Sequence, residues 1–292
     1  MHPFSLVFCG TPAFALPSLH ILCSDPAFDV KLVITQPDKP IGRDKNLHSP
    51  PVKHVAEKYG IKVLQPKNMN KELSSINDQL SSRPDFLVVV AYGQILSQEI
   101  LDIPAIAPVN IHASLLPRWR GASPLQHTIL HGDTVGGVTI QRMEYALDAG
   151  PILAQKSLFL DPRETTVTLR DKLSTLGAEL LQKTLKEPLH PESQDPTKVT
   201  MCHKLTRADG HVQTETMTAE EIDRSVRALV PWPGVTLFNQ TVKILETALE
   251  PMEHAYPIPC AENTILYLVT VQPPGKKPMT GAAWARGRPT PS

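Results

Sequence analysis

The sequence has no surplus of charge of either sign, because 29 Lys and Arg residues balance 29 Asp and Glu residues in a chain of 292. Such a protein can bind nucleic acid only through local basic patches, so the composition neither supports nor excludes an RNA partner. Long apolar runs are also lacking. The amino-terminal segment MHPFSLVFCGTP is too short in apolar residues for a signal peptide, and no stretch approaches the length of a membrane span. These absences predict a cytoplasmic protein without a membrane partner.

Cysteine is scarce, and its spacing matches none of the common cysteine-based sites. The four cysteines are Cys9, Cys23, Cys202 and Cys260. They form no C-x-x-C pair, and no histidine stands at the spacing of zinc ligands. A reduced protein without a structural metal is the simplest account.

The glycine-rich loop of dinucleotide-binding proteins is lacking as well. An apolar run at residues 5–9 leads through the turn Gly10-Thr11-Pro12 into a predicted helix over residues 14–23. This strand, turn and helix do not contain the full G-x-G-x-x-G pattern. A nicotinamide or flavin cofactor therefore has little support.

What the sequence does contain is a series of apolar runs separated by helical patterns. A chain of 292 residues with 41% hydrophobic content can bury one large core and one smaller core, so we expect two domains. Strands are predicted at residues 30–35, 62–64 and 86–90, and a helix near residues 71–80. The run at 86–90 is continuously apolar, as at the centre of a parallel sheet. The pattern predicts an α/β domain with a mainly parallel sheet.

The most informative stretch is PVNIHASLLPRWRGASP at residues 108–124. Its first residues alternate, so Asn110 and His112 share one face of a predicted strand. A loop containing Pro117 and Gly121 follows, and a helix resumes near Ser123. The two polar side chains therefore lie at the carboxyl end of a parallel strand, where open α/β sheets bind ligands.

An amide, an imidazole and a carboxylate can together move an acyl group to an amine. Asn110 can donate to the oxyanion of a tetrahedral intermediate, and His112 can transfer protons. Asp148, in the LDAG turn, can fix the imidazole tautomer. Taken singly, each has an ordinary alternative: a histidine that ends a strand is usually structural, and an asparagine before a turn is common turn chemistry.

The combination of Asn-x-His, SLLPRWRG and a later Asp-x-Gly resembles the 10-formyltetrahydrofolate-dependent formyltransferases. The resemblance implies a Rossmann-like catalytic domain in which Asn110, His112 and Asp148 are catalytic. It also implies a folate site formed by two segments. The residues it assigns to folate are Ser114, Leu115, Leu116 and Pro117 after the strand, and Tyr92, Gly93, Ile95 and Leu96 in the preceding strand's turn.

The long loop after the second predicted strand is similar to the insertion loop of the family members that act on tRNA. It runs over residues 36–50 and carries the basic residues Lys39, Arg43 and Lys45. The resemblance implies that Arg43 approaches the acceptor end of tRNA. On charge alone, the loop is an ordinary solvated one, because Asp38 and Asp44 offset part of its charge.

The carboxyl-terminal third resembles the second domain of the same tRNA-using enzymes, an OB-like barrel. Residues 188–200 have linker composition, Thr218-x-x-Glu221 is a capping box that opens a helix, and QPPGKK supplies Lys276 and Lys277 for tRNA. Only three clear strands are predicted, so we expect a trimmed barrel and a frayed tail after Met279. The expected division is a catalytic domain over 1–188, a linker over 189–206 and an OB-like, tRNA-binding domain over 207–292.

The resemblance implies formyl transfer from 10-formyltetrahydrofolate to the α-amino group of methionyl initiator tRNA, by a monomer without a metal. Two alternatives stay open. A sugar-nucleotide aminoformyltransferase would share the Asn, His and Asp residues but would not need the loop, the PWPG segment or the basic end. A non-catalytic RNA-binding relative would not need the three site residues.

Overall fold

The computed structural model describes residues 2–41, 46–237 and 241–286. They form two compact units that interleave along the chain. The first unit contains residues 1–121, 136–158 and 170–201, and the second contains residues 122–135, 159–169 and 202–292. The expected domain boundaries at 188 and 206 stay a prediction.

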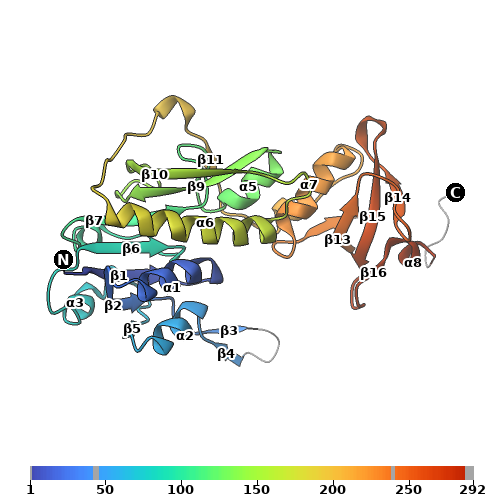
Figure 1. Cartoon of the computed structure of the whole chain (residues 1–292). Coiled ribbons are helices and arrows are strands. Elements are labelled where there is room, and N and C mark those ends of the chain that lie inside the picture. The colour runs from blue at the N-terminus through green and yellow to red at the C-terminus, as the bar shows by residue number, and fades with distance from the viewer. Residues whose placement is uncertain (1, 42–45, 238–240, 287–292) are drawn as a thin grey trace. The chain divides into compact units, whose positions relative to one another are not determined.

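A seven-stranded sheet forms the first unit (Figure 1). In spatial order its strands are β10 (Ile152–Phe159), β9 (Val135–Arg142), β7 (Ala107–His112), β6 (Phe86–Val90), β1 (Phe4–Gly10), β2 (Phe28–Ile34) and β5 (Val63–Leu64). From β7 to β5 the neighbouring strands are parallel, whereas β9 runs antiparallel to β7. The predicted α/β fold with a mainly parallel sheet is confirmed, and β6 is its central strand.

The helices that lie between these strands, or follow the last of them, cover the sheet because each buries an apolar face. They are η1 (Ala13–Ala15), α1 (Leu16–Ser24), α2 (Pro51–Lys58), α3 (Leu73–Asn77), α4 (Gln98–Leu101) and α6 (Thr166–Lys186). Ile76 of α3 and Ile100 of α4 join the core residues Val7 and Leu87 of the sheet. Gly177 of α6 lies so near Ile111 that an added Cβ would stand 2.9 Å from it. Helix α3 is shorter than the predicted helix at 71–80.

The segment after β2 contains regular structure, whereas the sequence predicts a loop. Strands β3 (Lys39–Ile41) and β4 (Asn46–His48) pair antiparallel and form a short hairpin. Arg43 and Lys45 lie outside the described residues. The two short strands escape prediction because neither is long enough to show a period of two.

The second unit is built on a five-stranded antiparallel sheet. Its strands are β12 (Val235–Leu237), β13 (Val242–Ala248), β15 (Ile265–Gln272), β14 (Tyr256–Pro259) and β16 (Met279–Thr280). The predicted β-rich second domain is confirmed. The expectation of only three strands is wrong, because β14 and β16 also belong to this sheet. Both β14 and β16 pair with β15.

Helices complete the second unit: α5 (Pro124–Leu130), α7 (Ala219–Leu229), η3 (Ala208–Gly210), η4 (Ala261–Asn263) and α8 (Gly281–Ala285). The predicted capping box of α7 is present, with Thr218 and Glu221 each bonded to the other's backbone N–H. The tail after Met279 is not frayed at α8, because Trp284 is buried there. Residues 287–292 lie outside the described part.

Candidate active site

Strand β7 brings the predicted pair of polar side chains to its carboxyl end. Asn110 pairs in register with Val89 of β6 and with Gln141 of β9, and His112 pairs with Thr139 of β9. The side chain of His112 is buried, and that of Asn110 is partly exposed. Because Asn110 and His112 are two residues apart on one strand, both side chains lie on the same face.

The hydrogen bond at one ring nitrogen fixes the tautomer of His112. Its Nε2 lies 2.8 Å from the carbonyl oxygen of Trp119. A carbonyl oxygen can only accept, so Nε2 must carry a hydrogen. The other nitrogen, Nδ1, lies 3.5 Å from Oδ1 of Asp148, and both side chains are nearly enclosed. Nδ1 is therefore the ring nitrogen that faces the Asp148 carboxylate.

Asp148 is held in place by its backbone and by two donors. Its φ of 49° is left-handed, a conformation that Asp and Asn tolerate better than most residues. Oδ2 accepts from the Gly121 N–H at 2.9 Å, and Oδ1 accepts from Nε2 of Gln141 at 2.8 Å. Gly150 makes this turn possible, because a Cβ there would lie 1.9 Å from the Arg142 carbonyl oxygen. The Asp-x-Gly pattern thus has a steric cause.

The loop between β7 and α5 supplies the acceptor for His112. Trp119 has a left-handed φ of 60° and a buried indole, and the guanidinium of Arg118 lies 4.2 Å from the centre of that ring. The Trp119 carbonyl then accepts the Nε2–H of His112. The RWRG segment therefore shapes the site through its backbone.

Asn110 differs from its neighbours in having unused hydrogen-bonding capacity. Its carboxamide makes no hydrogen bond with another of the described residues, whereas His112 and Asp148 are both engaged. A partly exposed amide beside a fixed imidazole and carboxylate is available to a ligand. The structure thus brings Asn110, His112 and Asp148 to one end of β7.

The segment assigned to folate after β7 is anchored to the neighbouring strands. The Leu116 N–H donates to Oγ1 of Thr139 at 3.0 Å, and Gln155 donates to the Leu116 carbonyl at 2.8 Å. Ser114 donates to the Arg118 carbonyl at 2.5 Å. Leu115 packs against Gly137, where an added Cβ would lie 2.5 Å from its side chain. Residues 114–117 are consequently a rigid wall beside His112.

The turn after β6, which is also assigned to folate, can contribute mainly its backbone groups to a ligand site. The side chains of Tyr92 and Leu96 are packed in the hydrophobic core, so only their backbone groups can meet a ligand. The Tyr92 carbonyl already accepts from Thr11 at 3.0 Å and from Gln36 at 3.2 Å. Ile95, in contrast, is 74% exposed, and Gly93 has a φ of 88°.

Among the residues assigned to tRNA, three fall in the described part, and all three are exposed. Lys39 opens β3 in the first unit, and Lys276 and Lys277 lie in the turn before β16 in the second. The base of the hairpin is fixed beside Lys39. Asp38 accepts from Gln65 at 2.6 Å, from Lys53 at 3.1 Å and from Ser49 at 2.9 Å, and these bonds lower the pKa of its carboxyl to about 2.

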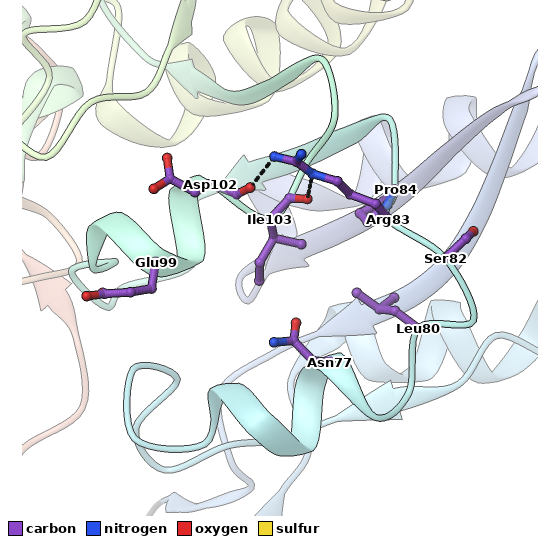
Figure 2. A pocket seen from close by; sticks show the side chains of 8 residues that line it. All are labelled: Asn77, Leu80, Ser82, Arg83, Pro84, Glu99, Asp102 and Ile103. Carbon is purple, nitrogen blue, oxygen red and sulfur yellow. Dashed lines mark hydrogen bonds between the residues drawn. The ribbon is translucent and has the colours of Figure 1, made fainter.

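A separate hollow of about 400 Å³ is lined by other residues, which Figure 2 shows. Its walls come from segments that precede β6 and β7, at the amino-terminal edge of the parallel strands. Arg83 closes one side by donating to the carbonyls of Ile103 at 2.8 Å and Asp102 at 2.6 Å. None of the predicted site residues lines it. The remaining lining residues are Asn77, Leu80, Ser82, Pro84 and Glu99.

Within residues 2–41, 46–237 and 241–286, no group of three or more His, Cys, Asp or Glu side chains is arranged to hold a metal ion. The described helices include none that is long and apolar enough to cross a membrane.

Several residues that shape the site carry no signal in the sequence. Gln141 and Gln194 contact the Asp148 turn, and Thr200 contacts Trp119. Two of these three lie in the segment predicted to be a linker. Alternation along β9 puts Gln141 on one face of the sheet but does not identify its partner, and no local pattern relates residue 194 to residue 148.

Two family models match the chain. The model described as formyl transferase matches residues 6–185, and the model described as formyl transferase, C-terminal domain, matches residues 204–289. The methionyl-tRNA formyltransferase of Roseiflexus sp. (strain RS-1) is 38% identical over 305 residues, covering 98% of this chain and 93% of the relative. That of Halorhodospira halophila (strain DSM 244 / SL1) is 45% identical over 236 residues, covering 80% and 75%.

Solved structures with the same fold are more distant in sequence. The N-formyltransferase from Helicobacter canadensis, in complex with folinic acid and dTDP-3-aminofucose, has a TM-score of 0.68 at 18% identity and covers 91% of this chain and 98% of its own. HypX from Aquifex aeolicus, in complex with tetrahydrofolic acid, has a TM-score of 0.62 at 15% identity and covers 97% of this chain and 47% of its own. At these identities the likeness shows the shared fold alone.

Proposed function

The chain belongs to the methionyl-tRNA formyltransferase family, and we propose that it transfers the formyl group of 10-formyltetrahydrofolate to the α-amino group of methionyl initiator tRNA. The proposal depends most on one observation. The unused carboxamide of Asn110 lies on the same strand face as His112, which is paired with Asp148. Both family models, and relatives aligned over nearly the whole chain, support the same activity.

In this proposal Asn110 stabilises the formyl group, which is the electrophile. When the neutral amine attacks the formyl carbon, the formyl oxygen gains negative charge in a tetrahedral intermediate. The Asn110 NH₂ group donates a hydrogen bond to that oxygen, which stabilises the charge more than it stabilises the ground-state carbonyl. The carboxamide has no other described partner to give up, so this bond costs no internal one.

In this proposal His112 and Asp148 transfer protons. The attacking amine must lose a proton, and the folate nitrogen must gain one as the carbon–nitrogen bond breaks. Because Nε2 of His112 is committed to the Trp119 carbonyl, the transferred proton moves through the Nδ1 and Oδ1 side of the pair. We expect the 3.5 Å separation between Nδ1 and Oδ1 to shorten to a hydrogen bond in the substrate complex, as catalytic hydrogen bonds often do. Residues Ser114 to Pro117 and the turn at 92–96 form the folate site.

The tRNA partner is served by basic residues outside the reaction centre. We propose that Arg43, with Lys39 and Lys45, contacts the acceptor end, and that Lys276 and Lys277 contact phosphates. A protein that acts on an aminoacyl-tRNA works where translation occurs, so a cytoplasmic location belongs to the proposal. The proposal also includes that the protein acts as a monomer and that it requires no metal.

The experiment that tests the proposal compares acceptors. The full chain is incubated with 10-formyltetrahydrofolate and either methionyl initiator tRNA or a sugar-nucleotide amine, and formylated product is quantified. We expect formyl-methionyl-tRNA and no formylated sugar. Formylation of the sugar alone would favour the aminoformyltransferase alternative, and binding of tRNA without any transfer would favour a non-catalytic relative.

A further inference from the structure

The segment over residues 192–200 falls between the two matched family models, which end at 185 and begin at 204. Its composition predicts a spacer. In the structure it belongs to the same compact unit as the active site and pairs with the strand after the Asp148 turn. Glu192 and Ile152 exchange both backbone hydrogen bonds, each at 2.8 Å. The segment is therefore anchored beside Asp148.

Thr200 uses all of its polar groups on the loop that carries the acceptor for His112. Its N–H donates to the Pro117 carbonyl at 3.2 Å, and its own carbonyl accepts from the Arg120 N–H at 2.9 Å. Its Oγ1 accepts from the Trp119 N–H at 2.9 Å. These three bonds fix the peptide units on both sides of Trp119, whose carbonyl accepts from His112.

Gln194 anchors the turn that carries Asp148, the partner of His112. Its Nε2 donates to the Asp148 carbonyl at 2.9 Å and to the Gly150 carbonyl at 2.7 Å. Its Oε1 accepts from Nε of Arg120 at 2.9 Å. One side chain therefore joins the turn that holds the carboxylate to the loop that holds the imidazole's acceptor.

We propose that Gln194 and Thr200 are positioning residues that set the distance and orientation between His112 and Asp148. This inference rests on the proposed function, since it concerns the same reaction centre. The physical reason is that neither His112 nor Asp148 is fixed by β7 alone: each depends on a loop, and the two loops are joined through residues 192–200. Misplacing a catalytic group by about 1 Å can cost on the order of 10² in rate. The connection between the family's two domains is, in this chain, part of the active-site frame.

The kinetic test uses full-length variants that keep side-chain size. Thr200→Val removes the acceptor for the Trp119 N–H. Gln194→Glu replaces the donating NH₂ group with a carboxylate oxygen, which faces the carbonyl oxygens of Asp148 and Gly150 and repels them. Thr200→Ser restores the hydroxyl. Thr197→Val is the matched control, because the Thr197 side chain, in the same segment, bonds to Asp195 alone among the described residues. We expect Thr200→Val and Gln194→Glu to lower kcat by about 10-fold to 10²-fold with KM for methionyl-tRNA changed less than about twofold. Thr200→Ser and Thr197→Val should remain near the parent.

A second readout does not depend on the acceptor. Protein labelled with ¹⁵N-histidine reports the His112 Nε2–H resonance, which is assigned by its loss in His112→Gln. Thr200→Val should shift this resonance, and Thr197→Val should leave it in place. An unmoved resonance with kcat within about twofold of the parent would overturn the inference, as would an equal loss in Thr197→Val. If the parent formylates no tRNA while the resonance shifts as expected, the proposed function fails and the positioning role stands.

Discussion

Two enclosed aspartates, one in each unit, are held in different ways. Asp148 accepts from a backbone N–H and from the amide of Gln141, and its ionisable neighbour is a histidine. Asp223 on α7 is fully buried and receives two guanidinium groups. Arg163 bonds to both of its oxygens at 2.8 and 2.7 Å, and Arg227 bonds at 2.8 Å. Thr247 adds a fourth hydrogen bond at 2.8 Å.

The difference lies in whether the partner's charge can change. A guanidinium does not give up its proton in proteins, so the Asp223 carboxylate faces two fixed positive charges. An imidazole can both donate and accept a proton, so the Asp148 carboxylate faces a partner that can exchange one. Asp223 links the segment before α6, helix α7 and strand β13 within the second unit, because Arg163 also donates to the Thr247 carbonyl at 2.7 Å. In the proposed function the Asp148 carboxylate takes part in the chemistry, whereas the Asp223 carboxylate ties three segments of the second unit together.

The largest effect is expected when Asp148 becomes Asn, which keeps the left-handed backbone but removes the charge. The new NH₂ group must face one of the donors that Asp148 now accepts from, and it cannot stabilise an imidazolium. We predict that kcat/KM falls on the order of 10³ to 10⁴, by analogy with loss of the aspartate in a serine protease triad. Steady-state formylation of methionyl-tRNA measures it.

The same substitution on the surface, Asp78→Asn, is the control for Asp148→Asn and should leave the rate unchanged. Circular dichroism should show that both variants are folded. A nearly normal rate in Asp148→Asn would reduce Asp148 to a turn residue and leave the catalytic assignment to Asn110 and His112.

Asn110→Ala should lower the catalytic rate and leave stability unchanged, whereas a change at Asp223 should do the reverse. We predict a loss of about 10² to 10³ in kcat, the usual cost of one oxyanion donor, with folate affinity retained. Stability should hardly change, because the carboxamide bonds to none of the described residues. Asn77→Ala on α3 is the matched control. Half of the parent's activity in Asn110→Ala would contradict the oxyanion role.

Asp223→Asn tests the structural half of the comparison. Neutralising this residue leaves two guanidinium groups without their counter-charge, and breaking a buried pair in this way costs about 3 kcal/mol of unfolding free energy. Urea denaturation followed by fluorescence measures the loss. The rate per folded molecule should equal that of the parent, and a selective loss of kcat at full stability would show that Asp223 also serves the reaction.

Arg43→Ala is expected to act on substrate binding alone. If Arg43 contacts a phosphate, the variant should raise KM for methionyl-tRNA and lower the salt dependence of binding by about one unit of log–log slope. Folate affinity should be unchanged. A minimal aminoacyl fragment that lacks the acceptor stem provides the control, and an equal loss with that fragment would exclude a phosphate contact.

The smallest effect concerns Asp38, a partly exposed carboxylate held by Gln65, Lys53 and Ser49. Those bonds lower its pKa from 3.8 to about 2, so its contribution to stability is complete above about pH 4 and is lost as the pH falls toward 2. The difference in Tm between the parent and Asp38→Asn should shrink over that interval. A difference independent of pH would show that the charge of Asp38 does not stabilise the hairpin base.

The elements predicted well are those whose pattern is local and long enough to repeat. Residues 86–90 form one continuously apolar strand, β7 alternates over Ala107–His112, and Thr218 with Glu221 encodes a cap within one helical turn. Strand alternation also placed Asn110 and His112 on one face. Each of these predictions depends only on residues within a few positions of one another.

The sequence by itself therefore determined the sheet, the strand face on which Asn110 and His112 lie, and the family to which the chain belongs. Only the tertiary structure decided that Tyr92 and Leu96 point into the core, that the sheet of the second unit has five strands instead of three, and that Gln194 bonds to the Asp148 turn and Thr200 to Trp119. The reason is physical. A period of two or 3.6 residues encodes which face is buried, whereas a hydrogen bond between residues 148 and 194 depends on how two distant segments meet, and no local pattern carries that information.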